Sequence, residues 1–303
     1  MRSTDMSARG TMNPVPIQQV PGVYRRRIGD IVVTALSDGY LDADVGVFRS
    51  ITRPEIDQIL TESFRPSPPR LSVNAFLVHA KGRVALIETG AGDTMGPTLG
   101  KLIDNMRAAG TRPEDIDTVL LTHMHPDHSN GLCSSTGERN FPNAELLIHE
   151  DEVNHWTDDA AMSVAPERKR VRYYEASRKQ LAPYRGQLRP IREGEVFPGV
   201  TAVPIPGHTP GHTAYLIADG AESVLVWGDT VHVPEIQVRK PDVTLDFDSD
   251  PAAAVAMRRR LFDMATTDRM LIAGMHVHFP GFSYVTRRGD GYDLVPEAWL
   301  PAL

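Results

Sequence analysis

The stretch Thr122-His123-Met124-His125-Pro126-Asp127-His128 decides how this chain is interpreted. It places three imidazoles and a carboxylate within six residues, directly after the apolar run Thr118-Val119-Leu120-Leu121. Such a run is typical of a buried strand, so we expect the histidines to leave a sheet and enter a tight loop. His123 and His125 point the same way in extended backbone, whereas the last two residues of the stretch follow the turn at Pro126. Packing alone does not explain this arrangement, and the spacing predicts a loop that binds two adjacent metal ions.

Three further segments repeat the pattern of an apolar strand, a small residue and a ligand-type side chain. They are Gly207-His208-Thr209-Pro210-Gly211-His212, Gly228-Asp229-Thr230 and Gly274-Met275-His276-Val277-His278. Each follows a short apolar run, so each is expected at the end of a strand, where a rigid sheet can position binding groups. The sequence therefore predicts that several strand ends contribute ligands to one site.

These segments, together with Thr89-Gly90-Ala91-Gly92-Asp93, resemble the motifs of the metallo-β-lactamase-fold metallo-hydrolase superfamily and occur in the same order. The resemblance spans about residues 28–285. Within the superfamily, the segments 228–233 and 276–281 most resemble the branch that contains methyl parathion hydrolase and some acyl-homoserine lactonases. The superfamily implies an α+β fold, a four-layer αββα sandwich, with the ligand loops along one edge.

The local patterns agree with two sheets whose helices pack outside. Strands are expected at 31–36, 72–79, 83–88, 118–121, 145–149 and several places between 200 and 273. Helices are expected at 52–60, 97–109, 166–181 and 252–264, the first and last with clear capping residues at Thr52 and Asp250. The segment 151–184 carries no ligand motif and is a candidate lid over the site.

The resemblance implies a site for two Zn²⁺ ions, or for other divalent metals such as Fe, Mn or Co. It assigns one metal to His123, His125 and His208, the second to Asp127, His128 and His276, and the bridging position to Asp229. Three neutral imidazoles with a water form a known catalytic zinc arrangement. The family pattern favours His276 over His278 as a ligand, and it gives His212 a supporting role beside the metals.

The implied activity is that of a dinuclear zinc hydrolase, in which a metal-bridging hydroxide opens a lactone or cleaves an ester. Asp127 is the expected acid/base residue. Homoserine lactonases of the better-known branch have a tyrosine three residues after the bridging aspartate, and here His232 stands at that position, as in the methyl parathion hydrolase branch. His232 is either a hydrogen-bond donor to substrate or a structural histidine. Trp156, Phe279 and Phe282 are the candidate residues of an apolar substrate pocket.

Other functions remain open at this point. An organophosphate triesterase is the first alternative, followed by a thioesterase of the glyoxalase II type, whose basic C-terminal glutathione site is matched here only by Arg287-Arg288. A sulfur dioxygenase with one iron would need only His123, His208 and Asp229. A non-enzymatic metal-binding scaffold is disfavoured, because such a protein would be expected to lose ligands. Activity on acyl-homoserine lactones would make the protein a quorum-quenching enzyme.

Composition narrows the choice of partners. The 303 residues carry a net charge of -7, which argues against nucleic acid as a partner. The short basic runs Arg168-Lys169-Arg170 and Arg258-Arg259-Arg260 lie in expected helices and are interpreted as solvated faces. The single cysteine, Cys133, permits no intrachain disulfide.

Organisation along the chain is expected to be simple. Residues 1–22 are interpreted as a flexible arm and residues 23–303 as one hydrolase domain. The sequence offers neither a membrane span nor the apolar core of a secretory signal, so a cytoplasmic protein is expected. The arm and the branch resemblance together suggest a homodimer that acts on a small ester or lactone.

Overall fold

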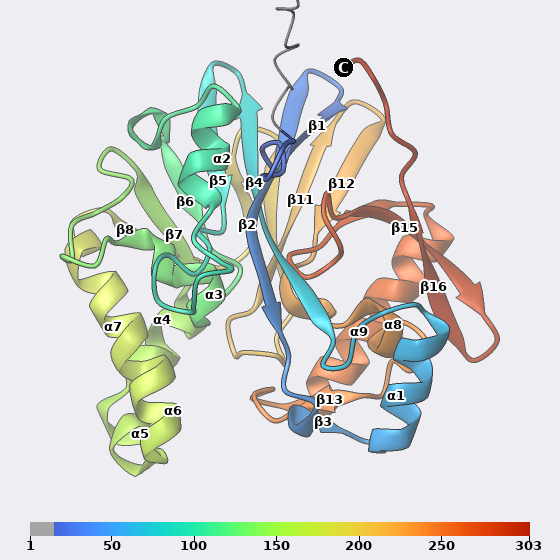
Figure 1. Ribbon diagram of the computed structural model, residues 1–303. Helices are drawn as coiled ribbons and strands as arrows, with labels where there is room; N and C mark the ends of the chain where they lie inside the picture. Colours follow the sequence, from blue (N-terminus) through green and yellow to red (C-terminus); the bar gives the residue numbers. More distant parts are fainter. Residues whose placement is uncertain (1–14) are drawn as a thin grey trace, which may run out of the picture.

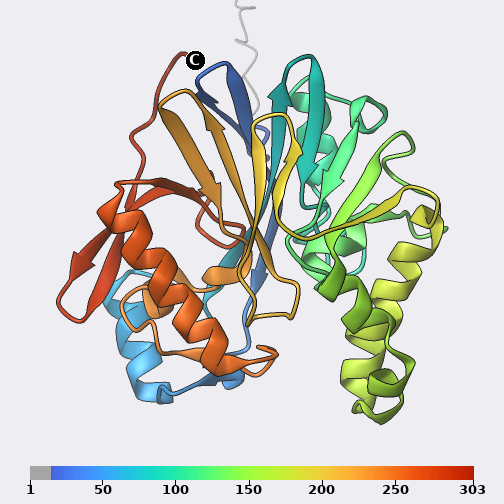
Figure 2. The same cartoon turned by 180° about the vertical axis from the view of Figure 1, so that it is seen from behind.

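The computed structural model describes residues 15–303. Two seven-stranded sheets face each other, and helices cover their outer faces (Figures 1 and 2), which confirms the predicted αββα sandwich. Residues 1–14 of the expected N-terminal arm lie outside the described residues, and residues 15–22 form neither helix nor strand.

The first sheet has the order β1-β2-β4-β5-β6-β7-β8. Its strands are β1 (Val23–Ile28), β2 (Ile31–Asp42), β4 (Arg70–Ala80), β5 (Arg83–Ile87), β6 (Thr118–Leu120), β7 (Glu145–His149) and β8 (Leu188–Ile191). The strands from β1 to β5 pair antiparallel, whereas β5, β6, β7 and β8 run parallel. The carboxyl ends of β5 to β8 therefore meet at one edge of the sheet.

The second sheet has the order β16-β15-β14-β12-β11-β10-β9. Its strands are β9 (Gly194–Phe197), β10 (Val200–Pro204), β11 (Thr213–Asp219), β12 (Glu222–Val226), β14 (Leu271–Ala273), β15 (Phe282–Arg288) and β16 (Gly291–Pro296). Only β12 and β14 pair in parallel, so their carboxyl ends lie side by side. A small separate sheet pairs β3 (Phe48–Arg49) with β13 (Thr244–Leu245).

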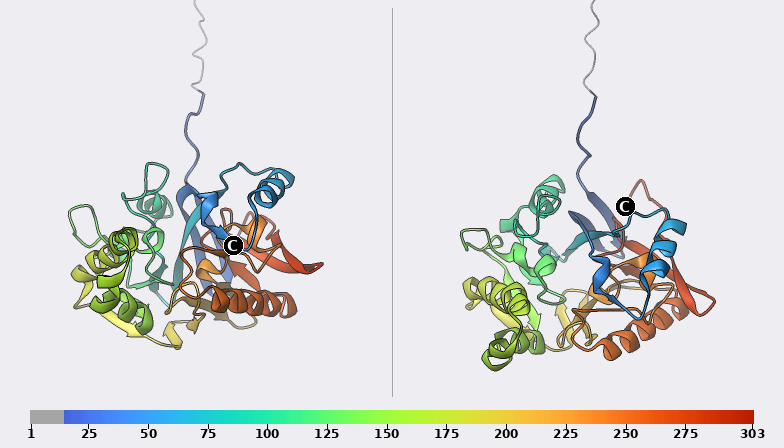
Figure 3. Two further views of the ribbon diagram at one scale, coloured as in Figure 1. Left: turned by 90° about the horizontal axis from the view of Figure 1, so that it is seen from below. Right: turned by 60° about the horizontal axis from the view of Figure 1, so that its bottom comes forward.

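Helices flank the sandwich on two sides (Figure 3). On the side of the first sheet lie α2 (Leu102–Ala108), α3 (Pro126–Ser129), α4 (Glu150–Thr157), α5 (Asp159–Val164), α6 (Glu167–Lys169), the π-helix η4 (Arg170–Glu175) and α7 (Ala176–Leu181). On the other side lie α1 (Arg53–Glu62), α8 (Pro234–Gln237) and α9 (Pro251–Thr267). Single 3-10 turns are η1 (Val45–Val47), η2 (Pro113–Asp115), η3 (Asn130–Leu132), η5 (Ala182–Tyr184) and η6 (Gly228–Thr230).

The helix starts follow their predicted caps, with one correction. The Thr52 side chain accepts a hydrogen bond from the backbone of Glu55, and Asp250 caps α9 in the same way. The helix predicted for 97–109 begins only at Leu102, so the prediction was wrong for its first turn. Gly100 has φ +78°, outside helical backbone, and a Cβ there would lie 2.6 Å from the carbonyl oxygen of Gly92.

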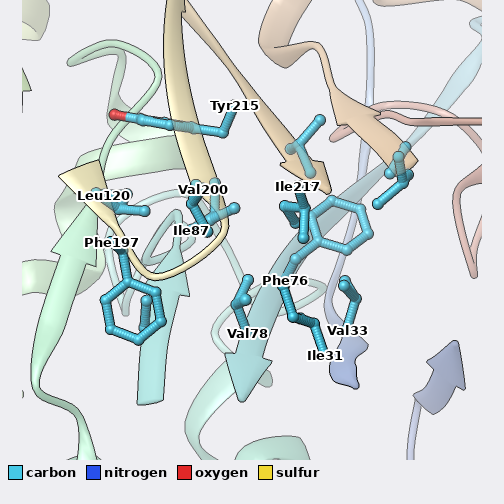
Figure 4. Close-up of a cluster of buried hydrophobic side chains, with 14 of the residues drawn as sticks. Ile31, Val33, Phe76, Val78, Ile87, Leu120, Phe197, Val200, Tyr215 and Ile217 are labelled. Carbon is cyan, nitrogen blue, oxygen red and sulfur yellow. The ribbon is translucent and has the colours of Figure 1, made fainter. Parts of the chain in front are cut away.

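Three apolar layers hold the sandwich together. The central layer lies between the two sheets, where Phe76 and Leu120 of the first sheet share one cluster with Tyr215 of the second (Figure 4). Separate clusters join the first sheet to the helices on its side and the second sheet to α9. Close packing of this kind makes the sheets a rigid base for the loops at their edge.

Among residues 15–303, no helix combines the length and the apolar character that crossing a lipid bilayer requires.

Candidate metal centre

Four loops that follow strands bring the ligand-type side chains together. β6 leads to His123 and into α3, where His125 is the N-cap residue and Pro126 opens the helix. His208 lies in the loop after β10, Asp229 in η6 directly after β12, and His276 in the loop after β14. Both sheets therefore contribute to a single cluster, as the sequence pattern predicts.

One carboxylate oxygen, Oδ2 of Asp229, lies at the middle of this cluster. Five imidazole nitrogens surround it, all of them Nε2: those of His232 at 3.0 Å, His128 at 3.2 Å, His276 at 3.3 Å, His208 at 3.5 Å and His123 at 3.6 Å. Asp229 is only 3% exposed. The central position is the one that a bridging carboxylate needs.

Among the described residues, four overlapping groups of side chains could hold a metal ion, and two of them contain the predicted ligand sets. One group, whose ligand atoms all lie within 4.8 Å of one another, contains His123, His125, His208 and Asp229. The second, by the same measure, contains Asp127, His128 and His276. Imidazoles and carboxylates are the donors that zinc and related divalent ions bind.

Unpartnered buried atoms show that the donor set fits such ions. Nε2 of His123, both ring nitrogens of His128 and Oδ1 of Asp229 are buried without a hydrogen-bond partner among the described residues. Leaving buried polar atoms without a partner costs about 1–3 kcal/mol each. Bound cations would satisfy Nε2 of His123, Nε2 of His128 and Oδ1 of Asp229, whereas Nδ1 of His128 faces Glu88. The residues present therefore fit a metal centre.

The rings are fixed through the nitrogen that faces away from the centre. The group that hydrogen-bonds to this nitrogen sets the tautomer and the orientation of a ligand imidazole. Nδ1 of His123 lies 2.9 Å from Oγ1 of Thr122, Nδ1 of His208 lies 2.8 Å from Oδ1 of Asp248, and Nδ1 of His276 lies 2.8 Å from the carbonyl oxygen of Ser72.

Glu88 lies behind His128 at the end of β5. Its Oε1 accepts a hydrogen bond from the backbone N–H of Thr122 at 3.0 Å and lies 3.5 Å from Nδ1 of His128. Burial raises the pKa of this carboxyl group, against the opposing effect of His128. The residue has φ +70°, an uncommon conformation for a non-glycine residue that often marks a functional site.

Burial and mutual charge set the electrostatics of the cluster. Burial lowers the pKa values of His123 and His125 well below the usual range, and neighbouring imidazoles act in the same direction. Burial opposes ionisation of Asp229, but His128 and the other surrounding imidazoles hold its pKa well below the usual range. Asp229 is therefore ionised and His123 and His125 are neutral, whereas Asp229 raises the pKa values of His128 and His276 against the effect of their burial.

The histidines that the sequence left open take separate positions. His212 accepts a hydrogen bond at Nε2 from the backbone N–H of Asp229 at 3.0 Å, which suits a supporting role. His278 points away from the cluster and lies 2.7 Å from Oε1 of Glu235. His232 lines a cavity that opens onto the cluster, and burial lowers its pKa to about 4.

A buried carboxylate that sequence reasoning missed supports the first ligand loop. Oε1 of Glu152 in α4 accepts hydrogen bonds from the backbone N–H of Met124 at 2.9 Å and from Nε1 of Trp156 at 2.6 Å. Glu152 is completely buried. Its place in a charged helical segment gave no signal, because its partner in the ligand loop, the backbone N–H of Met124, is distant in sequence.

Arg258 is buried, although the sequence predicts it on a solvated face. It is 2% exposed, and it donates hydrogen bonds to the carbonyl oxygens of Thr230 at 2.7 Å, Pro241 at 2.7 Å and Val243 at 2.9 Å. Burial lowers the pKa of this guanidinium to about 10. Arg258 thereby connects α9 to the residue that follows Asp229.

A cavity of about 240 Å³ opens onto the cluster. Its polar lining includes Asp127, Asp229, His125, His232 and His276. Its apolar lining, which sequence reasoning mostly missed, includes Leu41, Val47, Phe48, Leu71, Met95, Val233, Leu245 and Phe247. The candidate lid contributes Arg168, Arg172 and Tyr173.

The three aromatic residues expected in a substrate pocket lie elsewhere. Phe279 and Phe282 line a different cavity, beside Tyr24 and His278. Trp156 is 1% exposed and lines a cavity adjoining the catalytic one. The structure therefore places none of the three among the residues that line the catalytic cavity.

The chain belongs to the metallo-beta-lactamase superfamily, whose family description matches residues 68–276. It is 32% identical to the hydrolase AbOPH of the beta-lactamase superfamily, whose crystal structure superposes with a TM-score of 0.88 over 93% of this chain and 100% of that one. AidC, a dizinc quorum-quenching lactonase in complex with a product, shares the fold with a TM-score of 0.87, 24% identity and coverage of 92% and 99%.

Curated relatives match over shorter stretches. A probable metallo-hydrolase of Mycobacterium tuberculosis is 30% identical over 41% of this chain and 39% of its own length. An N-acyl homoserine lactonase of Bacillus thuringiensis is 23% identical over 57% of this chain and 60% of its own length. The chain thus spans less than two thirds of these relatives. It is a metallo-hydrolase of the metallo-β-lactamase fold, related to lactonases, with a cluster of histidines and aspartates able to bind metal.

Proposed function

We propose that the protein is a two-zinc hydrolase that opens lactones or cleaves esters. The observation that carries the proposal is the ring of imidazole nitrogens around Oδ2 of Asp229, which opens into a cavity with largely apolar walls. When bound, two divalent ions at this place would supply a water-derived nucleophile at neutral pH and polarise the substrate. An apolar cavity suits the acyl part of a lactone or ester.

The metal ligands of this proposal are the predicted ones. His123, His125 and His208 would hold one ion, Asp127, His128 and His276 would hold the other, and Asp229 is the carboxylate proposed to lie between the two sets. Asp127 has a side chain that is 15% exposed, and it lines the cavity. Burial opposes ionisation of Asp127, but His128 and His276 hold its pKa below the usual range. We therefore assign its carboxylate two steps: it accepts the proton released by the attacking water and then passes that proton to the leaving oxygen of the substrate.

His232 is the proposed hydrogen-bond donor to the substrate oxygen. It lines the cavity, and neither of its ring nitrogens makes a hydrogen bond to the described residues, although Nε2 lies 3.0 Å from Asp229. A structural histidine would be expected to have such a partner. The absence of one favours the interpretation in which His232 faces the substrate.

The test measures proton release by the zinc-loaded protein with N-hexanoyl-homoserine lactone and with a phenyl ester of the same acid. Metal content is measured on the same samples by mass spectrometry. We expect hydrolysis that is lost in His123→Ala together with part of the bound metal. Two bound metals without hydrolysis of either compound would contradict the proposal.

An organophosphate triesterase is the second candidate, and His232 favours it. The position holds a histidine where the better-known lactonases have tyrosine, and the apolar cavity accepts an aryl leaving group equally well. Cleavage of an aryl dialkyl phosphate by a protein that leaves the lactone intact would select this alternative.

A further inference from the structure

A second cavity, of about 250 Å³, adjoins the catalytic one. The residues that line both cavities are Val47, His125, Arg168, Tyr173 and Phe247. The ring of His125 lies 4.8 Å from that of Tyr173 and 6.0 Å from that of Phe247, measured between ring centres. A substrate that reaches both cavities therefore passes beside a candidate metal ligand.

The two cavities differ in the chemistry of their walls. The catalytic cavity is lined mainly by aliphatic and aromatic side chains beyond the metal centre. The second cavity shares Arg168 with the first and adds Lys169, Asp246, Asp248 and Ser249, together with the apolar Trp156 and Pro166. Arg168 and Lys169 are both exposed to solvent. One part of a ligand is therefore expected to be apolar and the other polar.

The carboxylates of the second cavity are already paired. Asp248 lies 2.8 Å from Nδ1 of His208, and Asp246 forms an ion pair with Arg49. Neither of these two carboxylates is therefore free to neutralise a cation in the cavity.

The cations of the second cavity have no such partner. In the same helical segment, Arg170 pairs with Glu175. Within residues 15–303, by contrast, no carboxylate lies within 4.0 Å of Arg168, Lys169 or Arg172. Arg172 lies at the rim of the catalytic cavity. Arg168 and Lys169 are thus the two cations of the second cavity without an ion-pair partner among the described residues, beside the paired Asp246 and Asp248.

We propose that this second cavity is an anion subsite, in which Arg168 and Lys169 bind a carboxylate of the substrate. The substrate class is an amphiphilic ester or lactone, with an apolar group in the catalytic cavity, the scissile bond beside His125, and a carboxylate in the second cavity. This inference rests on the proposed hydrolase function. It gives a role to the basic run 168–170, which the sequence alone assigned to a solvated face.

The test compares matched substrates that differ by one charge. The metal-loaded full chain is first given 3-(hexanoyloxy)benzoate and its neutral counterpart 3-(hexanoyloxy)benzamide. It is then given phenyl 5-carboxypentanoate and its neutral counterpart phenyl 5-carbamoylpentanoate, a pair in which the charged group lies on the acyl side of the scissile bond. We expect the carboxylate of at least one pair to have about a 10-fold higher kcat/KM, mainly through KM, as two partly exposed cations can provide. The preference should shrink in 0.5 M salt.

The double variant Arg168→Gln/Lys169→Gln should reduce this preference, measured as the ratio of the two kcat/KM values within a pair, to about 1-fold. Arg170→Gln is the matched control, since Arg170 lies in the same segment but pairs with Glu175, and it should keep the preference. Cleavage of neutral esters without any preference for a carboxylate would overturn the subsite and leave the hydrolase function standing.

A binding measurement decides the case in which no ester is cleaved. Calorimetry compares 3-hydroxybenzoate with 3-hydroxybenzamide, and 5-carboxypentanoate with 5-carbamoylpentanoate. Tighter binding of an anion that is lost in the double variant, but kept in Arg170→Gln, supports the subsite even if the hydrolase function fails. If the double variant binds the anion as tightly as the unmodified protein does, the anion binds at the metals and the proposed subsite is overturned.

Discussion

Glu152 accepts a hydrogen bond from the backbone N–H of Gly211 at 3.1 Å, and this contact joins the two loops that carry His123 and His208. Glycine is required at this point, because a Cβ on residue 211 would lie 2.3 Å from the backbone nitrogen of Glu152. A single carboxylate thus fixes the spacing between loops that belong to different sheets. Its partners include no metal ligand, so its influence on the centre is one of positioning.

The first prediction concerns Glu152→Gln. An amide offers one acceptor oxygen, so at least one of three buried N–H donors loses its partner, at a cost of about 1–3 kcal/mol in the free energy of unfolding. Metal affinity should fall about 10- to 100-fold, as for other supporting residues. Urea unfolding and chelator competition measure the two effects. Glu150→Gln in the same helix is the control, and equal metal affinity in both variants would refute a positioning role.

The two histidines of the loop after β14 should behave differently. His276→Ala should lose about one metal per chain, because Nε2 of His276 lies 3.4 Å from Oδ2 of Asp127 and 3.3 Å from that of Asp229. His278→Ala should keep the full metal content, because His278 contacts Glu235 instead. Asp229→Ala should lose the two-metal state altogether. Metal analysis checks all three variants, and full loading of Asp229→Ala would remove its bridging assignment.

Glu235 predicts a pH dependence of stability. Burial opposes its ionisation, but hydrogen bonds from His278 and Arg65 lower its pKa from 4.5 to about 2. Because the folded-state pKa is the lower one, this stabilisation of about 3 kcal/mol is complete above about pH 4.5 and is lost as the pH falls toward 2. Glu235→Gln should therefore cost most at pH 6–7 and progressively less below pH 4.5.

Urea unfolding of both proteins between pH 3.5 and 7 measures the difference. Glu193→Gln, at an exposed position, serves as the control and should show no such trend. A cost of Glu235→Gln that is the same at every pH would contradict the assignment.

Arg258→Met should destabilise the protein despite its similar length. The substitution leaves the carbonyl oxygens of Thr230 and Pro241 without their buried donor and leaves that of Val243 with Gln237 alone. We expect a loss of about 3 kcal/mol or more in the free energy of unfolding. Arg260→Met on the exposed face of α9 should change it by less than about 0.5 kcal/mol. Similar losses of unfolding free energy in Arg258→Met and Arg260→Met would show that the buried hydrogen bonds of Arg258 do not stabilise the protein.

The expected homodimer remains a prediction. Apolar side chains near both ends of the described chain are strongly exposed, Val15 at 81%, Ile17 at 93%, Val20 at 81% and Trp299 at 74%. We interpret these exposed apolar side chains as the contact surface of the predicted dimer. Light scattering should give about twice the chain mass of 33.4 kDa, and Ile17→Asp/Val20→Asp should give that mass itself. Gln18→Asp/Gln19→Asp is the control, and a monomeric unmodified protein would exclude the dimer.

The fold and the ligand candidates could be predicted because their signals are local. His123 and His125 share a face through their spacing alone, and an apolar run before each ligand segment marks a strand end. The capping pattern at Thr52 likewise needs only neighbouring residues. Such patterns indicate which residues reach the edge of the sandwich, even before the strand order is known.

The walls of the cavity and the supporting shell could not be predicted in this way. Phe247, Tyr173 and Asp248 reach the site through packing between distant segments, which spacing does not encode. The basic runs show the same limit, since Arg258 is buried and Arg168 lines two cavities. Periodicity indicates that a helix has a polar face, but it does not show what that face meets.

The ligand candidates are divided between the two sheets, and this division has a consequence for how the protein matures. The half of the chain that contains His123 to His128 has no counterpart of Asp229, and the half that contains Asp229 has only His208 and His276 from the two ligand sets. Neither half can assemble the centre alone. In the proposed function, complete metal loading would therefore follow the docking of the two halves, and the bound ions would then link the two sheets.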